Sequence, residues 1–501
     1  MEFYDVVDGF FNKVEYRSPS IIRYDEFKTW VNEMIQGNKK VLLYGDYDPD
    51  GLNCILIWKE AFHLLKFKNF DIFKYRKRTH ALDIQAKKQA LGGNYDYIII
   101  NDASSSDMDS ILELTKAGIK VLIVDHHQTR YDYNDYPSDC LIINSTIENR
   151  YNQEDLIVSA GALCFVLLHK VLSDYRIPCF HLSAYALFSL YADSIDMSNE
   201  LNRSIYFMAM SLSDELIPVE IDAFLNSYQK FCRRFIEFHM TPKINSAFRM
   251  EHFDELNRYF LDERRATRGE ASNLVEFLTN LHKLSAEMVA TASDIIYHEV
   301  HDSFVVANLN TVNAHIDIRE NKLYNFTGLI ANKLAERYKK SAVVYCGLRG
   351  NIKGSFRDLY GRNYLKIFQK FCRAEGHNSA FGINMEMFEI HDFLNHLRIV
   401  DKKFALDKSL NSPILLTDYY MPPDVYVLND MSIYNEFAGN KCPLALVEII
   451  RRADMPEKPS GYGGYIYRWG NYNIHSRRRI PVGTRMTIRP TVGKGLKMYV
   501  V

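Results

Sequence analysis

Val41-Leu42-Leu43-Tyr44-Gly45-Asp46-Tyr47-Asp48-Pro49-Asp50-Gly51 is the stretch that decides the fold, because an apolar run leads directly into three carboxylates. Such a continuous run is typical of a strand that is buried on both faces of a parallel sheet. Three further runs, at residues 96–100, 121–124 and 141–143, also end in polar residues, and helical segments such as 54–65 and 109–117 lie between them. The pattern predicts βαβ units in an α/β fold, with the polar strand ends at the carboxyl edge of the sheet, where ligands bind.

The rest of the chain divides into three further units after a first domain at residues 1–262. Apolar residues recur at helical spacing within residues 263–300 and predict a long connecting helix (Leu274, Phe277, Leu278, Leu281, Leu284 and Met288). Residues 301–405 contain strand patterns at 304–307, 342–345 and 354–357 and a helical pattern at 328–338, which predict a smaller α/β domain. Residues 411–501 hold short β runs at 425–428, 464–467 and 485–488 and predict a small OB-like β-barrel.

The composition excludes several classes of protein. A chain of 501 residues with 47% hydrophobic residues, 25% charged residues and a formal charge of -1 is expected to fold into several domains. No apolar run approaches the roughly 20 residues of a membrane span, and the acidic start does not resemble a secretory signal. The eight cysteines occur without a C-x-x-C pair, which argues against a zinc ribbon and indicates core cysteines in a reducing compartment. We expect a soluble, cytoplasmic protein.

The three carboxylates of Asp46, Asp48 and Asp50 indicate a metal site. Alternate residues of an extended segment project to the same side, so these carboxylates are expected to converge and to attract Mn²⁺ or Mg²⁺. A calcium-binding loop has similar spacing, but the position six residues beyond Gly51, where such a loop has a bidentate glutamate, is Ile57. A solvated turn is the remaining alternative for this motif taken alone.

Three further acidic positions follow apolar segments. Asp102 follows the second strand, Asp125-His126-His127 follows the third, and Asp193 follows a helical segment. Carboxylate and imidazole ligands together suit Mn²⁺. A bridging aspartate can hold two cations about 3.5–4 Å apart, the arrangement that stabilises attacking and leaving oxygens in phosphoryl hydrolysis.

In this order, the acidic stretches resemble the four motifs of the DHH phosphoesterases. Pro242-Lys243-Ile244-Asn245-Ser246-Ala247-Phe248-Arg249-Met250 is similar to the P-x-I-N-A-x-G-R-[ML] element of the RecJ branch, the single-strand-specific exonucleases. Gly328-Leu329-Ile330-Ala331 resembles the opening of the associated DHHA1 domain. Ser355-Phe356-Arg357 and Gly376-His377-Asn378-Ser379-Ala380-Phe381-Gly382 resemble its S-x-R and G-G-H-x-x-A-x-G elements. The resemblance spans about residues 40–390 and implies a DHH domain, a connecting helix and a DHHA1 domain.

The resemblance implies a metal-dependent exonuclease that hydrolyses single-stranded DNA from the 5′ end with two cations, Mn²⁺ or Mg²⁺. One cation would be held by Asp48 and Asp102, with support from Asp46. The implied ligands of the other are Asp50, Asp102, His126 and Asp193, so that Asp102 bridges. His127 would contact the scissile phosphate or protonate the leaving oxygen.

Substrate contacts are also implied by the resemblance. Asn245 and Arg249 would grip the nucleotide, and the neighbouring phosphates would be held by four residues of the second domain: Ser355, Arg357, Gly376 and His377. The family usually has glycine where this chain has Phe248 and Glu375, and Asp102 is followed here by Ala103-Ser104-Ser105. These departures leave the implied metal ligands in place and concern the shape of the substrate channel.

The C-terminal region combines aromatic residues with arginines. Trp469 and the run Arg477-Arg478-Arg479 are expected to stack on bases and neutralise phosphates on a single-strand platform. The alternative is a solvated basic edge beside a small β core.

Two other functions are open. One alternative is a DHH phosphodiesterase of short oligonucleotides or cyclic dinucleotides, and the other is a non-catalytic nucleic-acid-binding factor of replication or repair. Single-stranded DNA is the expected partner, a single-strand-binding protein or a helicase is a candidate for a second one, and no membrane is expected.

Overall fold

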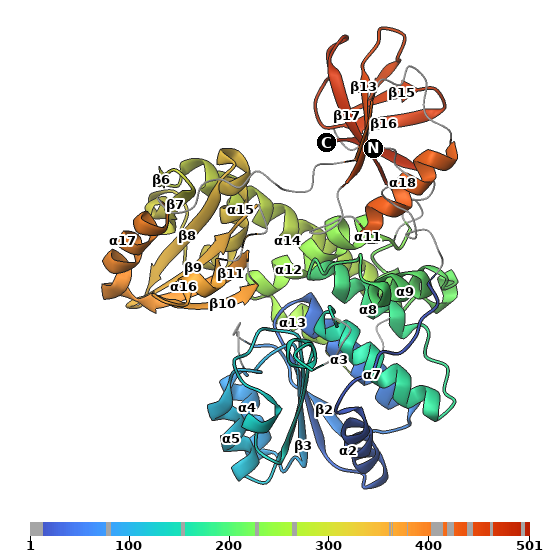
Figure 1. Cartoon of the computed structure of the whole chain (residues 1–501), viewed down its shortest axis with the longest axis vertical. Helices are drawn as coiled ribbons and strands as arrows, with labels where there is room; N and C mark the ends of the chain where they lie inside the picture. Colours follow the sequence, from blue (N-terminus) through green and yellow to red (C-terminus); the bar gives the residue numbers. More distant parts are fainter. Residues whose placement is uncertain are drawn as a thin grey trace.

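The structure of the chain is a computed structural model with three β-sheets arranged around a central group of helices (Figure 1). It describes residues 14–76, 82–151, 156–225, 230–262, 268–359, 362, 364–377, 379–401, 414–417, 425–437, 444–460, 464–491 and 496–501. Within these residues, no helix is both long enough and apolar enough to cross a membrane.

The first sheet is fully parallel, as the sequence predicts. Its five strands have the order β2-β1-β3-β4-β5, and every residue of β1, β3 and β5 is buried. The strands are β1 (Val41–Gly45), β2 (Phe70–Ile72), β3 (Tyr97–Asn101), β4 (Lys120–Asp125) and β5 (Cys140–Asn144). The accompanying helices are α2 (Tyr24–Gln36), α3 (Pro49–Leu64), α4 (Ile84–Gly92), α5 (Met108–Lys116) and α6 (Ser145–Glu148).

A helical region follows and shares one hydrophobic core with the first sheet. Helices α7 (Ala160–Asp174) and α8 (Leu182–Ala192) are mostly apolar and buried, and they pack against α3 and against each other. The remaining segments are α9 (Glu200–Met210), α10 (Val219–Asp222), α11 (Arg233–Phe235), the π-helix η3 (Ile236–Met240), α12 (Thr241–Arg249), α13 (Phe253–Leu256) and the π-helix η4 (Asn257–Leu261).

A long helix and a second, mixed sheet form the next unit. The predicted connecting helix is α14 (Arg268–Ile295), and the sheet has the order β10-β11-β9-β8-β7-β6 with separate apolar cores on its two faces. Its strands are β6 (His298–Val300), β7 (Phe304–Asn308), β8 (Ser341–Leu348), β9 (Asn351–Arg357), β10 (Arg373–His377) and β11 (Ala380–Glu386). The helices include α15 (Thr327–Tyr338), α16 (Leu365–Phe368) and α17 (Ile390–Asp401), and 3-10 turns lie at η5 (Leu309–Ala314), η6 (Leu323–Phe326) and η7 (Met387–Glu389).

The first two units meet at the end of α12. The side-chain amide of Asn325 in η6 donates to the carbonyl oxygen of Arg249 at 2.8 Å. Just before η6, Lys322 forms an ion pair with Glu251 at 3.2 Å. Because η6 leads directly into α15, this contact fixes the start of α15 against the helix that carries Asn245 and Arg249.

The C-terminal unit contains a seven-stranded sheet and a helix. The strand order is β12-β13-β17-β18-β16-β15-β14, formed by β12 (Ile414–Thr417), β13 (Ala445–Ile450), β14 (Glu457–Pro459), β15 (Tyr465–Trp469), β16 (Tyr472–Ser476), β17 (Arg485–Thr491) and β18 (Lys497–Val500). The predicted strand at 425–428 is wrong, because these residues begin helix α18 (Val425–Phe437), whose Leu428, Met431 and Tyr434 are buried in this unit's core. The OB-like barrel stays a prediction, and we propose the unit boundaries 1–262, 263–300, 301–405 and 411–501 as the sequence suggests them.

Candidate active site

The predicted acidic residues gather at the carboxyl edge of the first sheet. Asp46 follows β1, Asp102 follows β3, and His126 follows β4, while Asp193 is the C-cap of the neighbouring α8. Among the described residues, their ligand atoms form three groups in which all atoms lie within 4.8 Å of one another. We name them the first group (Asp46, Asp48, Asp102), the second group (Asp50, His126, Asp193) and the shared group (Asp102, His126, His127).

The carboxylates of the opening motif do not converge as an extended segment would make them. Asp48 is the N-cap of α3, and its side chain accepts hydrogen bonds from the backbone N–H groups of Asp50 and Gly51 at 2.9 and 3.0 Å. The helix therefore begins between Asp48 and Asp50 and turns Asp50 toward the second group. Gly51 allows this turn, because a Cβ atom there would lie 2.4 Å from the backbone nitrogen of Asp46.

Asp102 lies between the first group and the second group. Both its carboxylate oxygens are buried and accept no hydrogen bond from the described part of the chain. Burial, followed by the charges of Asp50 and Asp48, raises the pKa of Asp102 well above its usual range. A buried carboxylate without hydrogen-bond donors is destabilising unless a cation binds it, so this residue fits a bridging metal ligand.

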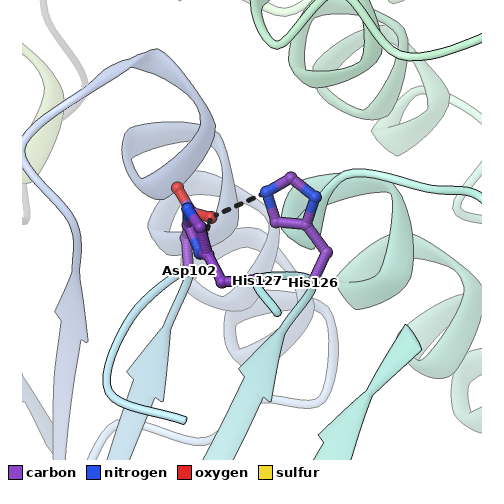
Figure 2. A group of neighbouring side chains, drawn as sticks. All are labelled: Asp102, His126 and His127. Carbon is purple, nitrogen blue, oxygen red and sulfur yellow. Dashed lines mark ion pairs between the residues drawn. The ribbon is translucent and has the colours of Figure 1, made fainter. Parts of the chain in front are cut away.

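His126 is surrounded by carboxylates, as Figure 2 shows for Asp102. Its Nε2 atom lies 3.1 Å from Asp193, 3.3 Å from Asp102 and 3.7 Å from Asp50. Burial lowers the pKa of His126, but the hydrogen bond and charge of Asp193 outweigh burial and raise it to about 9. These buried carboxylates require a positive charge beside them. Together with the imidazole of His126, they form a set of ligands that fits divalent cations.

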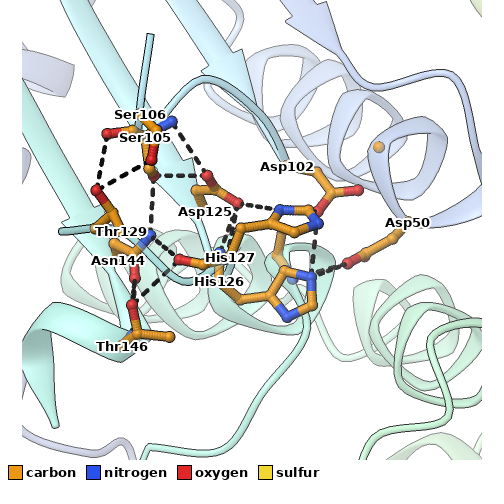
Figure 3. Close-up of polar contacts among 12 residues, drawn as sticks. Asp50, Asp102, Ser105, Ser106, Asp125, His126, His127, Thr129, Asn144 and Thr146 are labelled. Carbon is orange, nitrogen blue, oxygen red and sulfur yellow. Dashed lines mark hydrogen bonds and ion pairs between the residues drawn. The ribbon is translucent and has the colours of Figure 1, made fainter. Parts of the chain in front are cut away.

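His127 is held mainly by Asp125, although its Nδ1 atom also lies 3.7 Å from Asp102. Its Nδ1 atom lies 2.8 Å from Asp125 Oδ1, which also accepts from the backbone N–H groups of His126 and His127 (Figure 3). Burial lowers the pKa of His127, and the charge of Asp125 raises it to about 10. Asp125 thereby fixes the imidazole and keeps it protonated, while its own pKa is held below the usual range by His127 against the effect of burial.

Three polar residues that the sequence did not single out support Asp125 and His127. Ser105 donates its hydroxyl to Asp125 Oδ2 at 2.5 Å, and Asn144 donates to Ser105 Oγ at 2.9 Å and to the carbonyl of His127 at 3.0 Å. Thr146 donates to the same carbonyl at 3.1 Å (Figure 3). Asn144 ends the fourth apolar run, so its position at the strand end was an available signal. Ser105 and Thr146 carried none.

Helix α12 carries the predicted nucleotide contacts. Asn245 is half-buried, whereas Phe248 is completely buried and packs edge-on against Tyr75, with ring centroids 5.0 Å apart. The bulk of the Phe248 ring therefore lies in the core and not at the surface of α12.

The predicted phosphate contacts of the second sheet surround the start of α15. A Cβ atom at Gly328 would lie 2.4 Å from a guanidinium nitrogen of Arg357, so glycine lets the helix start contact this arginine. Burial lowers the pKa of Arg357 to about 10. Ser355 and Thr327 share a hydroxyl–hydroxyl bond of 2.9 Å.

Strand β10, which carries Gly376 and His377, lies at the edge of the same sheet and is separated from β9 by β11. Gly376 has a φ angle of 137°, a conformation that favours glycine. Glu375 is exposed and pairs with Arg373 at 2.9 Å, so it turns away from the sheet. The side chain of His377 lies outside the described part of the structure.

The expected role of Trp469 is not compatible with the structure. Its side chain is completely buried in the core of the C-terminal unit, where it cannot stack on a base. Arg477, Arg478 and Arg479 are exposed, and Arg479 pairs with Glu457 at 2.8 Å. The arginines alone are therefore available for phosphate contacts.

Comparisons with known proteins agree with this geometry. Residues 40–184 match the DHH family, N-terminal domain. The chain is 25% identical over 364 residues to the "Putative SPbeta prophage-derived single-strand DNA-specific exonuclease YorK" of Bacillus subtilis (strain 168), covering 65% of this chain and 59% of that protein. It is 21% identical over 380 residues to the single-stranded-DNA-specific exonuclease RecJ of the same organism, covering 73% of this chain and 46% of RecJ. The chain thus spans about three fifths or less of the length of these curated relatives.

A solved structure extends the likeness to almost the whole fold. RecJ from Thermus thermophilus, determined in complex with Mn²⁺, superposes with a TM-score of 0.72 at 17% identity over 98% of this chain and 72% of that one. Residues 40–184 therefore form a DHH-family domain. The chain as a whole is similar to RecJ proteins, whose fold it shares.

Proposed function

We propose that this DHH-family nuclease is a metal-dependent exonuclease that hydrolyses single-stranded DNA from 5′ to 3′ by a two-metal mechanism. The observation that supports the proposal best is the buried carboxylate of Asp102, which belongs to the first group and lies 3.3 Å from His126 of the second group. The names of the relatives, which are exonucleases of single-stranded DNA, support the substrate class. The polarity is proposed by analogy with the RecJ branch.

The proposed metal ligands are those of the first and second groups. Asp48 and Asp102, with Asp46 beside them, would hold one cation, and the other would be held by Asp50, Asp102, His126 and Asp193. Mn²⁺ or Mg²⁺ bound there would acidify water and neutralise charge on the phosphate. On cation binding, His126 must lose the proton that its acidic neighbours retain in the metal-free protein.

The chain's own residues would orient the substrate around this centre. His127, fixed through Nδ1 by Asp125, presents its opposite edge as a donor to a phosphate oxygen or to the leaving oxygen. Arg249 and Arg357 would pair with phosphates, since a guanidinium matches a phosphate with two parallel donors. Asn245, Ser355, Gly376 and His377 are the remaining proposed contacts.

The exposed arginines of the C-terminal unit suggest how the protein binds longer strands. The exposed Arg477, Arg478 and Arg479 would neutralise phosphates of a strand that extends beyond the active site. A single-strand-binding protein or a helicase would be the partner that supplies such a strand, which we propose only from the substrate class.

A single assay tests the proposal. Purified protein with Mn²⁺ is given four substrates: a 5′-labelled single strand, the matching duplex, a dinucleotide and a cyclic dinucleotide. We expect hydrolysis of the single strand alone, with the labelled 5′ mononucleotide as the first product. Preference for the dinucleotides would show a phosphodiesterase of short substrates, and binding without hydrolysis would show a non-catalytic factor.

A further inference from the structure

Asp50 is the most completely enclosed carboxylate of the second group. Its side chain is fully buried at the start of α7, where Oδ2 accepts from the backbone N–H of Ala160 at 2.9 Å and Oδ1 accepts from that of Gly161 at 2.8 Å. The hydroxyl of Ser189 also donates to Oδ1. Three donors from two different helices therefore fix one carboxylate whose Oδ2 atom lies 3.7 Å from His126 Nε2 (Figure 3).

Ser189 connects two candidate ligands. It lies in the last turn of α8, four residues before Asp193, so one helix end carries both a member of the second group and the hydroxyl that holds another member. Gly161 makes the contact possible, because a Cβ atom there would lie 2.0 Å from Ser189 Oγ and 3.0 Å from Asp50 Oδ1. The contact thus depends on the absence of a side chain at residue 161.

We propose that Ser189 is a positioning residue that, together with Gly161, holds Asp50 in the orientation needed to bind a cation in the second group. The inference rests on the proposed function, since it assumes that this group binds metal. A carboxylate held by three hydrogen bonds keeps one rotamer and loses no side-chain entropy when the cation arrives. Partners of this kind are typically worth about 10- to 100-fold in metal affinity.

The test compares three variants of the full chain by calorimetric titration with Mn²⁺. Ser189→Ala removes only the hydroxyl, and Gly161→Ala displaces it by filling the space beside it. We expect each to weaken binding of one of the two ions about 10-fold and to leave the other ion within about 2-fold. Ser183→Ala is the matched control, because Ser183 is also a fully buried serine of α8 but donates to the carbonyl of Phe180.

A second readout distinguishes positioning from a general loss of folding. The Mn²⁺ concentration that gives half-maximal hydrolysis should rise about 10-fold in Ser189→Ala, while the maximal rate returns at high Mn²⁺. Unchanged Mn²⁺ affinity of both ions in Ser189→Ala, or an equal loss in Ser183→Ala, would overturn the inference. Absence of Mn²⁺ binding by the wild-type protein would instead overturn the proposed metal centre and the inference with it.

Discussion

The hydroxyl of Tyr191 in α8 donates to the carbonyl oxygen of Glu436 at the end of α18, 3.1 Å away. Tyr191 lies two residues before Asp193, so the C-terminal unit touches the helix end that carries a candidate metal ligand. The contact is part of a larger anchor, because the backbone N–H of Arg233 donates to the Glu436 carboxylate at 2.7 Å and Phe437 belongs to the core of the first sheet. The last turn of α18 therefore fixes the C-terminal unit to the helical region.

Replacement of Phe437 measures how much this anchor contributes to the docking of the C-terminal unit. Its ring is 1% exposed and contacts the rings of Tyr206 and Phe207 at 5.0 and 6.0 Å. Phe437→Ala should weaken the docking by about 3–5 kcal/mol, the usual cost of deleting a buried phenyl ring. Scanning calorimetry is expected to show the C-terminal unit unfolding separately and earlier. Phe388→Ala, at a ring that is 81% exposed, is the control and should leave the transition unchanged.

Glu436 gives the anchor a pH dependence. Burial, which outweighs the opposing effect of Arg233, raises the pKa of Glu436 from 4.5 to about 7. The folded protein therefore binds this proton more tightly than the unfolded chain, so the contribution of Glu436 to the free energy of unfolding is greatest below pH 4.5 and declines until pH 7, by about 3 kcal/mol in total. Glu436→Gln should abolish the decline and make the variant more stable than wild type at pH 8.

Chemical denaturation at pH 4.5 and pH 8 measures this difference. The two proteins should agree at pH 4.5 and diverge at pH 8. Glu320→Gln, which removes one charge at an exposed glutamate, is the control. A Glu436→Gln variant that loses stability at pH 8 would mean that Arg233 requires the carboxylate charge, even though it also pairs with Glu237 at 2.8 Å.

The strand ends were predictable because both signals are local. A buried parallel strand needs a continuous apolar run, and the polar residue that follows it must lie at the sheet edge, as Asp102 and Asp125 do. The division of Asp48 and Asp50 between two groups was not predictable from alternation, because Pro49 begins a helix between them. Pro at the first helical position and an aspartate before it were the signal for that helix.

Two predictions for the C-terminal unit, the strand at 425–428 and base stacking by Trp469, were wrong because both were made from residue type without the spacing of the buried residues. Residues 425–428 are rich in β-branched and aromatic side chains, but Leu428, Met431 and Tyr434 follow at helical spacing, and packing of this face against the sheet decides the structure. Likewise, Tyr467 and Trp469 are two residues apart in a strand, so they share a face, and both are completely buried. Residue type alone suggested base stacking, whereas strand alternation would have placed both rings in the core.

The exposed arginines should contribute to binding of long strands. Arg477→Ala combined with Arg478→Ala is expected to weaken binding of a long single strand and to lower the salt dependence by about 0.7 for each phosphate that is no longer neutralised. Arg485→Ala is the charge-matched control, because Arg485 is exposed but already pairs with Glu448. Fluorescence anisotropy at several salt concentrations measures how steeply the affinity falls with salt for the double variant and for the wild-type protein. Equal slopes for the double variant and wild type would show that this edge does not contact the strand.

Asp102 offers the sharpest test of the metal centre, because its two roles predict opposite effects on activity and on stability. Asp102→Asn should abolish hydrolysis, since the shared ligand is lost. The same change should stabilise the metal-free protein by about 1–3 kcal/mol, because it removes a buried carboxyl group that accepts no hydrogen bond and lies among other carboxylates. Asparagine is preferred to alanine for the test, since Asp102 has a φ angle of 60°, which asparagine tolerates better than alanine does.

Thermal unfolding in EDTA measures the gain in stability of Asp102→Asn, and Mn²⁺ should stabilise the wild-type protein but not the variant. Undiminished hydrolysis by Asp102→Asn, or a variant less stable than wild type in EDTA, would contradict the role of Asp102 as a bridging ligand.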